Sequence, residues 1–468
     1  MTPAPVTASA GPGRRRIVVG TCDSLAPKMA GPAIRAWQIA AALSVEHEVR
    51  LVSTTIADLS DPRFSIEAVD DAGLEELERW CDVFVFQGWL IHSRPFLLSS
   101  DKTIVADLYD PLHLEQLEQG RDEGRRGRRQ AVQSATAVLN EQLIRGDFLV
   151  CASERQRDFW LGQLAAVGRI NPRTYDDDRT LRSLLAVVPF GVPDQPPVKT
   201  RAAMRGVVPG IGADDKVILW GGGIYNWFDP LTLLHAVDRI RRRIPDVRLQ
   251  FMGLKHPNPD IPEMRMAVAT RELSDRLGLT GRHVFFNEGW VDYEDRQNYL
   301  LEADVGVSTH LDGLESALSF RTRILDYLWA SLPVVATAGD ALADIVVSNG
   351  AGVSVPAGDV DALTDALVAI LEDPDRRKRC AENASEAASH LRWSQVLAPL
   401  VSFCRNPRRA PDLLDPALVG AMRTELAVVP PVPKGFREDF RALQDHLASG
   451  GARLVAAKTV GRVRRLWG

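Results

Sequence analysis

Two arginines, Arg321 and Arg323, stand at the start of an otherwise apolar segment, SFRTRILDYLWASLPVVAT, residues 319–337. Guanidinium groups bind phosphate and carboxylate oxygens through paired, charge-assisted hydrogen bonds. The free backbone N–H groups and the partial positive charge at the start of a helix favour anions as well. The segment therefore predicts an anion site, provided that a cleft lies beside the start of the helix.

The spacing of the two arginines restricts how they can bind one ligand. Ser319 predicts the helix start as its N-cap, and Leu332-Pro333 predicts the end of a helix of about 12 residues. Residues two apart lie roughly 200° from each other around a regular helix, so both cannot face one ligand from within it. Arg321 can face the ligand if it still lies in the preceding turn. Arg323 either binds the ligand or forms a salt bridge with Asp326, three residues later.

Three other loops are expected to supply groups to the same site. The glycines Gly222 and Gly223 follow a predicted strand and would let the backbone approach a phosphate closely. Lys255 follows another predicted strand, where it is either a point charge for phosphate or a solvated loop lysine. Gly31 lies in a loop that leads into a helix and would close over the ligand from the opposite side.

These residues depend on strands and helices that alternate along the chain. Short β-branched runs separated by helical patterns are typical of α/β units around a parallel sheet. A Pro-rich segment, 191–200, divides two such halves, and this arrangement predicts a ligand in the cleft between them, at the carboxyl ends of the strands. The expected strands are 14–22, 47–54, 81–88, 102–110, 147–153 and 184–192 in the first half, and 216–223, 247–253, 283–289, 303–309 and 332–337 in the second.

We therefore predict two doubly wound, Rossmann-like domains that face a cleft, followed by a helical C-terminal extension. The predicted boundaries are a disordered leader at 1–15, an N-terminal domain at 16–195, a C-terminal domain at 200–393 and helices at 394–468. The last stretch, 450–468, is basic and amphipathic. It either lies on an anionic membrane surface or docks on the body as a terminal helix.

Composition narrows the class of protein. The chain is 45% hydrophobic and 25% charged, as in ordinary soluble proteins, and its net charge of -5 argues against a nucleic-acid-coating role. No run approaches the roughly 18 apolar residues of a membrane span, and the N-terminus lacks the apolar core of a signal peptide. We therefore expect a cytoplasmic protein, at the inner face of the membrane if 450–468 binds lipid. The five scattered cysteines form no metal-binding spacing.

In order and spacing, these segments resemble the retaining glycosyltransferases of family 4, which have the GT-B fold. The resemblance covers roughly 16–404 and is strongest over 301–367, which is similar to the donor-binding region of that family. VVPFGVP, at 187–193, resembles the end of the family's first domain. FFNEGWVDYEDRQNYL, at 285–300, resembles the segment with the nucleotide-base contacts, which places Trp290 and Val291 at the donor.

The chain departs from the family pattern at the donor site. The family carries two glutamates around a Gly-Phe-Gly loop. Here Asp326 stands at the second glutamate, which implies a contact with the donor ribose, while Ser319, Phe320 and Arg321 replace the loop. The first glutamate falls on Leu318, so Glu315 either replaces it in catalysis or is a solvated loop acid.

Two cations that the family directs at the donor phosphates are also absent, because their positions fall on Gly223 and Phe228. A diphosphate needs cationic partners. Arg321, Arg323 and Lys255 are therefore the expected substitutes.

In the first half, DLYDPLHLE offers two further candidates, and the resemblance implies a polar group there near the transferred sugar. We expect Asp110 and His113 to contact the sugar or the acceptor. The alternatives are a helix cap before Pro111 for Asp110 and a partly buried helix residue for His113.

The resemblance implies a glycosyltransferase that moves a sugar from a nucleotide-sugar to a hydroxyl of a glycan or glycolipid, with retention and without a metal or other cofactor. Two alternatives stay open. One is a nucleotide-sugar epimerase of the same fold, which would form a new sugar isomer without an acceptor. The other is a glycosyltransferase-like binding protein without catalysis, which the missing cations favour.

Overall fold

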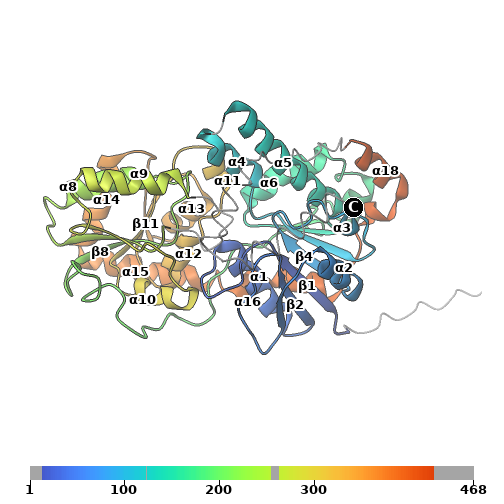
Figure 1. The fold of residues 1–468 in the computed structure, drawn as a ribbon, viewed down its shortest axis with the longest axis horizontal. Helices are drawn as coiled ribbons and strands as arrows, with labels where there is room; N and C mark the ends of the chain where they lie inside the picture. The colour runs from blue at the N-terminus through green and yellow to red at the C-terminus, as the bar shows by residue number, and fades with distance from the viewer. Residues whose placement is uncertain (1–12, 123, 255–262, 426–468) are drawn as a thin grey trace, which may run out of the picture.

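Two α/β domains lie side by side in the computed structural model, which describes residues 13–122, 124–254 and 263–425 (Figure 1). Each domain is built on one parallel sheet, with seven strands in the N-terminal domain and six in the C-terminal domain. Lys255 and the basic stretch 450–468 lie outside the described residues. The predicted fold class, two doubly wound domains, is confirmed.

The N-terminal sheet has the order β3-β2-β1-β4-β5-β6-β7, and all its neighbouring strands are parallel. The order reverses direction between β1 and β4, so the loops that follow these two strands diverge and open a crevice. The strands are β1 Arg16–Thr21, β2 Glu48–Ser53, β3 Ser65–Ala68, β4 Val83–Gln87, β5 Thr103–Asp107, β6 Phe148–Cys151 and β7 Leu185–Val187.

The C-terminal sheet repeats this plan with one strand fewer. Its order is β10-β9-β8-β11-β12-β13, again parallel throughout, and the reversal lies between β8 and β11. The strands are β8 Lys216–Trp220, β9 Val247–Phe251, β10 Val284–Phe286, β11 Val305–Ser308, β12 Val334–Thr337 and β13 Gly352–Val355.

Helices cover both faces of each sheet, which is why the central strands are continuous apolar runs. In β1, Ile17 and Val19 pack into one core while Val18 packs into another. The first of these cores continues into the second domain, where it includes Val217 and Leu219 of β8. The helices are α1 Gly31–Leu43, α2 Asp71–Trp80, α3 Pro95–Ser99, α4 Leu112–Gln119, α5 Arg125–Arg145, α6 Glu154–Ala166, α7 Pro172–Asp177, α8 Pro230–Ile240, α9 Arg265–Arg276, α10 Arg296–Leu300, α11 Leu314–Leu318, α12 Thr322–Trp329, α13 Ala341–Ser348, α14 Val360–Glu372, α15 Pro374–Ser389, α16 Trp393–Val396, α17 Ala398–Arg405 and α18 Pro416–Glu425.

The end of the described chain returns to the N-terminal domain, where Figure 1 shows α18 at the edge farthest from the C-terminal domain. Phe403 of α17 stacks on Phe148 of β6 with ring centroids 4.3 Å apart. Arg169 and Asp412 form a fully buried ion pair, with Nε 2.6 Å from Oδ2. The described part of the predicted helical extension therefore packs on the first domain.

The predicted strands are present, and the two that the sequence did not reveal are short and poorly buried. β3 and β13 are edge strands of their sheets. β3 has no fully buried residue, and β13 has one. After β5 the chain forms a hairpin of α4 and α5, which turns at Gly120. Arg128 Nε ties the hairpin together by donating to the Leu117 carbonyl at 2.9 Å.

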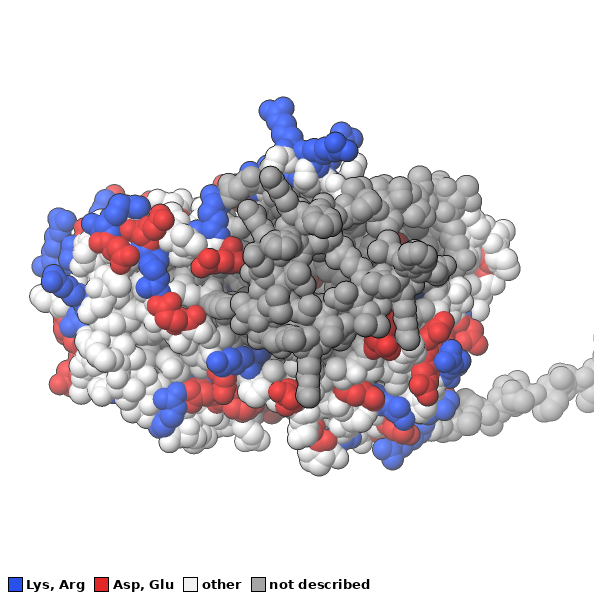
Figure 2. Space-filling view, in the orientation of Figure 1, with Lys and Arg blue, Asp and Glu red and all other residues white. Residues whose placement is uncertain are grey.

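Charged side chains of both signs are interspersed on the described surface in Figure 2. Lys and Arg gather at the projection at the top of that view, where the α4–α5 hairpin stands in Figure 1. Over the described ranges, no helix has the length and apolarity that crossing a bilayer would require.

Candidate functional site between the two domains

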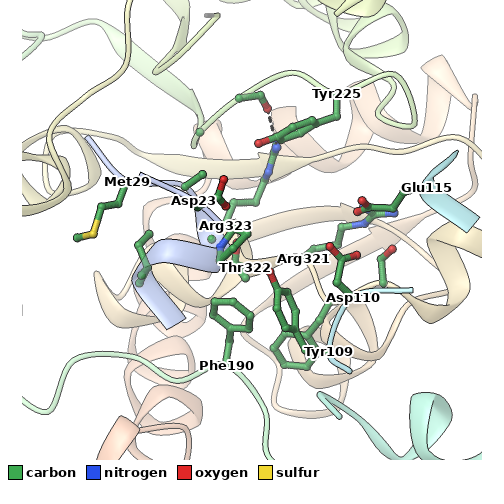
Figure 3. A pocket seen from close by; sticks show the side chains of 18 of the residues that line it. Asp23, Met29, Tyr109, Asp110, Glu115, Phe190, Tyr225, Arg321, Thr322 and Arg323 are labelled. Carbon is green, nitrogen blue, oxygen red and sulfur yellow. Dashed lines mark hydrogen bonds between the residues drawn. The ribbon is translucent and has the colours of Figure 1, made fainter. Parts of the chain in front are cut away.

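A cavity of about 390 Å³ lies between the facing carboxyl ends of the two sheets. The N-terminal domain contributes the ends of β1 and β4, the loop after β5 and the start of α1. The C-terminal domain contributes the glycine loop after β8, the segment after β10 and the start of α12 (Figure 3). The predicted site residues that line it are Gly31, Asp110, Gly222, Gly223, Trp290, Val291, Ser319, Phe320, Arg321, Arg323 and Asp326.

The segment predicted as one helix forms two, and the break explains why both arginines reach the cavity. Ser319 ends α11 instead of starting α12, and its hydroxyl donates to a carboxylate oxygen of Glu315. Arg321 is the N-cap of α12, with φ −78° and ψ 79°, and lies outside the helical spacing. The expected separation of roughly 200° therefore does not apply to this pair.

Arg321 is already paired within the protein. Its Nη2 lies 2.7 Å from Glu315 Oε2, and both side chains are almost completely buried. Glu315 lies behind Arg321 and is not among the residues that line the cavity. Glu315 was expected either to take part in catalysis or to be a solvated loop acid. In the structure it is neither in the cavity nor solvated, and it is instead a buried ion-pair partner of Arg321.

Arg323 is buried without a carboxylate partner among the described residues. Its Nη2 donates to the Gly223 carbonyl at 2.8 Å, and its Nη1 has no hydrogen-bond partner. Its guanidinium carbon lies 4.0 Å from the ring centroid of Phe228 and 4.4 Å from that of Trp220. Burial lowers the pKa of Arg323 to about 10, so the group stays protonated at neutral pH.

Of the two alternatives for Arg323, the salt bridge with Asp326 is absent, because Asp326 pairs with a different arginine. Arg296 Nε donates to Asp326 Oδ1 at 3.0 Å, and the Arg296 guanidinium lies over the Tyr293 ring at 3.6 Å. Arg296 also lines the cavity, and its Nη2 is buried without a partner. One feature of the sequence pointed to Arg296, because it lies within the segment predicted to contact the nucleotide base.

The guanidinium of Arg323 occupies the region where the sequence lacks its two expected cations. It hydrogen-bonds Gly223 and covers Phe228, and these are the two positions at which the resembling family carries Arg and Lys. A Cβ added to Gly223 would come within 2.8 Å of the Trp290 ring, so a side chain does not fit there. A cation from α12 thus reaches the same place from another element.

On the N-terminal side, Asp110 and Glu115 form a pair of carboxyl groups in the cavity wall. Their side chains are hydrogen-bonded to each other, and Figure 3 shows them together beside Arg321. Burial, and then the neighbouring Glu315, raise the pKa of Asp110 to about 6, although its hydrogen bond to Glu115 opposes this. Burial and Asp110 raise the pKa of Glu115 above its usual range. Two carboxyl groups this close share one proton, which leaves one negative charge.

His113 does not reach the cavity. Its ring stacks on Phe159 of α6 with centroids 5.5 Å apart, and burial lowers its pKa. This corrects the expectation of a sugar or acceptor contact and matches the alternative of a partly buried helix residue. Glu115 lies on α4 two residues after His113 and therefore on a different face of the helix. Sequence reasoning missed it, although DLYDPLHLE contains it.

Direct contacts join the two domains around the cavity. Trp290 Nε1 donates to the Met29 carbonyl at 3.2 Å. Gln156 Nε2 donates to the carbonyls of Tyr109 and Leu318 at 2.7 and 2.8 Å, which belong to different domains. Arg155 reaches Asp344 at 2.6 Å. Within the described part of the chain, no group of three or more His, Cys, Asp or Glu side chains is placed to hold a metal ion.

Comparison with solved structures identifies the fold. HepE from Anabaena, in complex with UDP-glucose, superposes with a TM-score of 0.61 at 14% identity, over 83% of this chain and 100% of that one. Sucrose-phosphate synthase from Thermosynechococcus elongatus gives 0.59 at 16% identity, over 84% and 98%. The chain has the GT-B fold.

Sequence comparisons concentrate on the second half of this GT-B chain. Residues 215–373 match the family described as glycosyl transferases group 1. A phosphatidyl-myo-inositol mannosyltransferase from Mycolicibacterium smegmatis is 30% identical over 170 residues, 36% of this chain and 39% of that protein. A D-inositol 3-phosphate glycosyltransferase from Kribbella flavida is 29% identical over 197 residues, 41% and 44%. The chain thus spans about two-fifths of the length of the curated relatives it matches.

Proposed function

We propose that the protein is a retaining glycosyltransferase of the family 4 type, which transfers a hexose from a nucleotide-sugar to a hydroxyl group. The observation that carries the proposal is the Arg323 guanidinium, which is buried in the cavity and which, among the described residues, has no partner at Nη1 and no ion pair with a carboxylate. A buried charge without a counter-charge is costly, and an anionic ligand offsets that cost. A nucleoside diphosphate supplies such an anion.

The cavity walls suggest how a nucleotide-sugar lies. The diphosphate meets Arg323, the start of α12 and the glycine loop, where Gly222 has the positive φ of +86° that favours glycine. Asp326 and Arg296 stand beside it for the ribose, and Trp290 and Val291 for the base. Fixed positive charge at the diphosphate stabilises the charge that develops as it leaves the sugar, which is the main catalytic task we assign to this wall.

We propose that this transfer needs no metal, because Arg323 supplies the positive charge. We further propose a glycan or glycolipid acceptor, a cytoplasmic location and contact with the membrane through 450–468.

A thermal-shift panel of nucleotides and nucleotide-sugars tests the donor part of the proposal. Binding to the folded state raises the melting temperature by mass action, so the matching nucleoside diphosphate should raise it by several degrees. Arg323→Met should reduce the shift. Arg276→Met is the matched control, because Arg276 lies on the surface of the same domain and outside the cavity.

Turnover then separates the enzyme from its alternatives. Mass spectrometry of reactions with the best nucleotide-sugar should show transfer of the sugar to a hydroxyl compound, with the anomeric configuration retained by NMR. A new sugar isomer formed without acceptor would identify an epimerase. A protein that binds no nucleotide would contradict the proposal altogether.

A further inference from the structure

The charges that line the cavity are divided between the two domains. Among the described residues that line it, every Lys, Arg or His comes from the C-terminal domain, namely Arg296, Arg321 and Arg323. The N-terminal wall instead presents the carboxyl groups of Asp23, Asp110 and Glu115, while Asp326 of the C-terminal wall is paired with Arg296. A ligand that fills the whole cavity therefore meets positive charge at one end and negative charge at the other.

The N-terminal end also contains a hydrogen-bond acceptor that nothing in the described protein uses. Gln87, at the end of β4, is 4% exposed and lines the cavity, and its Oε1 has no partner. Its Nε2 donates to the Pro32 carbonyl. Because a carbonyl can only accept, the amide nitrogen must face Pro32, and this fixes Oε1 as the free end. A buried acceptor without a donor is destabilising, so this atom requires a donor from a ligand or from water.

The carboxyl pair adds further acceptors on the same wall. With one proton shared between Asp110 and Glu115, the pair keeps one negative charge and oxygen lone pairs for which the protein supplies no cation from this wall. Arg321 is the nearby guanidinium, and its charge is already matched by Glu315 at 2.7 Å. The N-terminal end therefore stays anionic and rich in acceptors.

We propose that this end of the cavity is the acceptor subsite and that it takes an uncharged, polyhydroxylated ring while it excludes a phosphorylated one. The inference rests on the glycosyltransferase function proposed above, and it names the chemical class of its acceptor. Hydroxyl groups of the ring donate to Gln87 Oε1 and to the carboxyl oxygens of Asp110 and Glu115. The Trp89 indole, which also lines this end, offers an apolar surface to the ring face.

Charge sets the selectivity. A phosphate on the ring carries acceptor oxygens and negative charge, so it cannot donate to Gln87 and it is repelled by the carboxyl pair. A site built to hydrogen-bond one partner discriminates strongly against another that leaves its buried polar groups unpaired. We expect the neutral ring to bind at least about tenfold more tightly than its phosphorylated form, which corresponds to about 1.4 kcal/mol.

The test uses matched pairs that differ only by a phosphate: myo-inositol with myo-inositol 1-phosphate, glucose with glucose 6-phosphate and mannose with mannose 6-phosphate. Each is titrated by isothermal calorimetry into the full-length protein with UDP or GDP present. At least one neutral member should bind, and its phosphorylated partner should bind at least tenfold more weakly. Glu115→Gln should narrow that gap. Glu118→Gln, the same change on the same helix but outside the cavity, should leave it unchanged.

Two results would overturn the inference: equal or tighter binding of the phosphorylated members, or no binding of any neutral member. An unchanged gap in Glu115→Gln would overturn the assignment of the carboxyl pair. Each of these results, obtained with a protein that still binds a nucleoside diphosphate, would leave the proposed function intact. Failure to bind any nucleotide would instead contradict the proposed function.

Discussion

The two domains share one topology but give the cavity opposite charges. Both sheets are parallel. In both, the order in which successive strands are added to the sheet reverses between the first strand and the fourth strand in chain order. The loops at the carboxyl ends nevertheless carry arginines in the C-terminal domain and carboxyl groups in the N-terminal domain. The sheets thus fix where ligand groups stand, and the short loops after the strands decide which chemistry each half performs.

The strongest test of this comparison asks whether Arg321 is committed to Glu315 or is available to bind an anion, as Arg323 is. Arg321→Met should lower the free energy of unfolding by about 3–5 kcal/mol, because it leaves Glu315 as an uncompensated buried charge. Urea denaturation of the ligand-free protein measures this loss. The double variant Arg321→Met/Glu315→Gln removes both charges and should recover most of it. A single variant as stable as wild type would show that Arg321 is not committed to Glu315.

Arg323 should behave in the opposite way. Arg323→Met removes a buried charge that has no carboxylate partner among the described residues, so the melting temperature of the ligand-free protein should not fall. Affinity for UDP or GDP, measured by calorimetry, should fall roughly 10- to 100-fold, as expected for a hydrogen bond to a charged group worth about 1.5–3 kcal/mol. If Arg323→Met instead lowered the stability and left the nucleotide affinity unchanged, Arg323 would have the structural role that we assign to Arg321, and this prediction would be contradicted.

On the N-terminal side, the carboxyl pair predicts a pH dependence of stability. The pKa of Asp110, about 6, and that of Glu115 are raised in the folded state, so the folded protein holds protons that the unfolded chain has released. Stability must therefore fall as pH rises from about 4 through 6. Glu115→Gln relieves the repulsion and should melt on the order of 2 °C above wild type at pH 8, with a smaller difference at pH 5. A difference that grows toward pH 5 would contradict the shared proton.

The smallest expected effect concerns the exposed contact between the domains. Arg155 and Asp344 form an ion pair with both side chains about half exposed, and such pairs contribute roughly 0.2–1 kcal/mol. Arg155→Ala should therefore change the melting temperature little but increase the hydrogen exchange of the segments around 155 and 344. A large loss of stability would mean that this contact, and not the continuous core, holds the domains together.

The fold was readable from the sequence because central parallel strands are buried on both faces and appear as apolar runs. β3 and β13 were not predicted, because most of their residues are partly exposed and the strands therefore do not appear as such runs. Most of the predicted donor wall lines the cavity because strand ends are set by the fold. The pairing of its charges was not predictable: it depends on a break in the helix at Ser319 and on Arg296, which takes the partner expected for Arg323.

The two connections between the domains meet at one point. Val192, in the first connection, donates to the Leu391 carbonyl at 2.8 Å and accepts from the Trp393 backbone N–H at 2.9 Å in the second. Gly191 allows this approach, because an added Cβ would lie 2.8 Å from the Trp393 ring. Because the two connections are hydrogen-bonded to each other, we expect them to act as a single hinge. Such a hinge resists sliding of one domain past the other but permits rotation about the line through it. We therefore expect the cavity to open by rotation, with the largest displacement at the rim farthest from Val192.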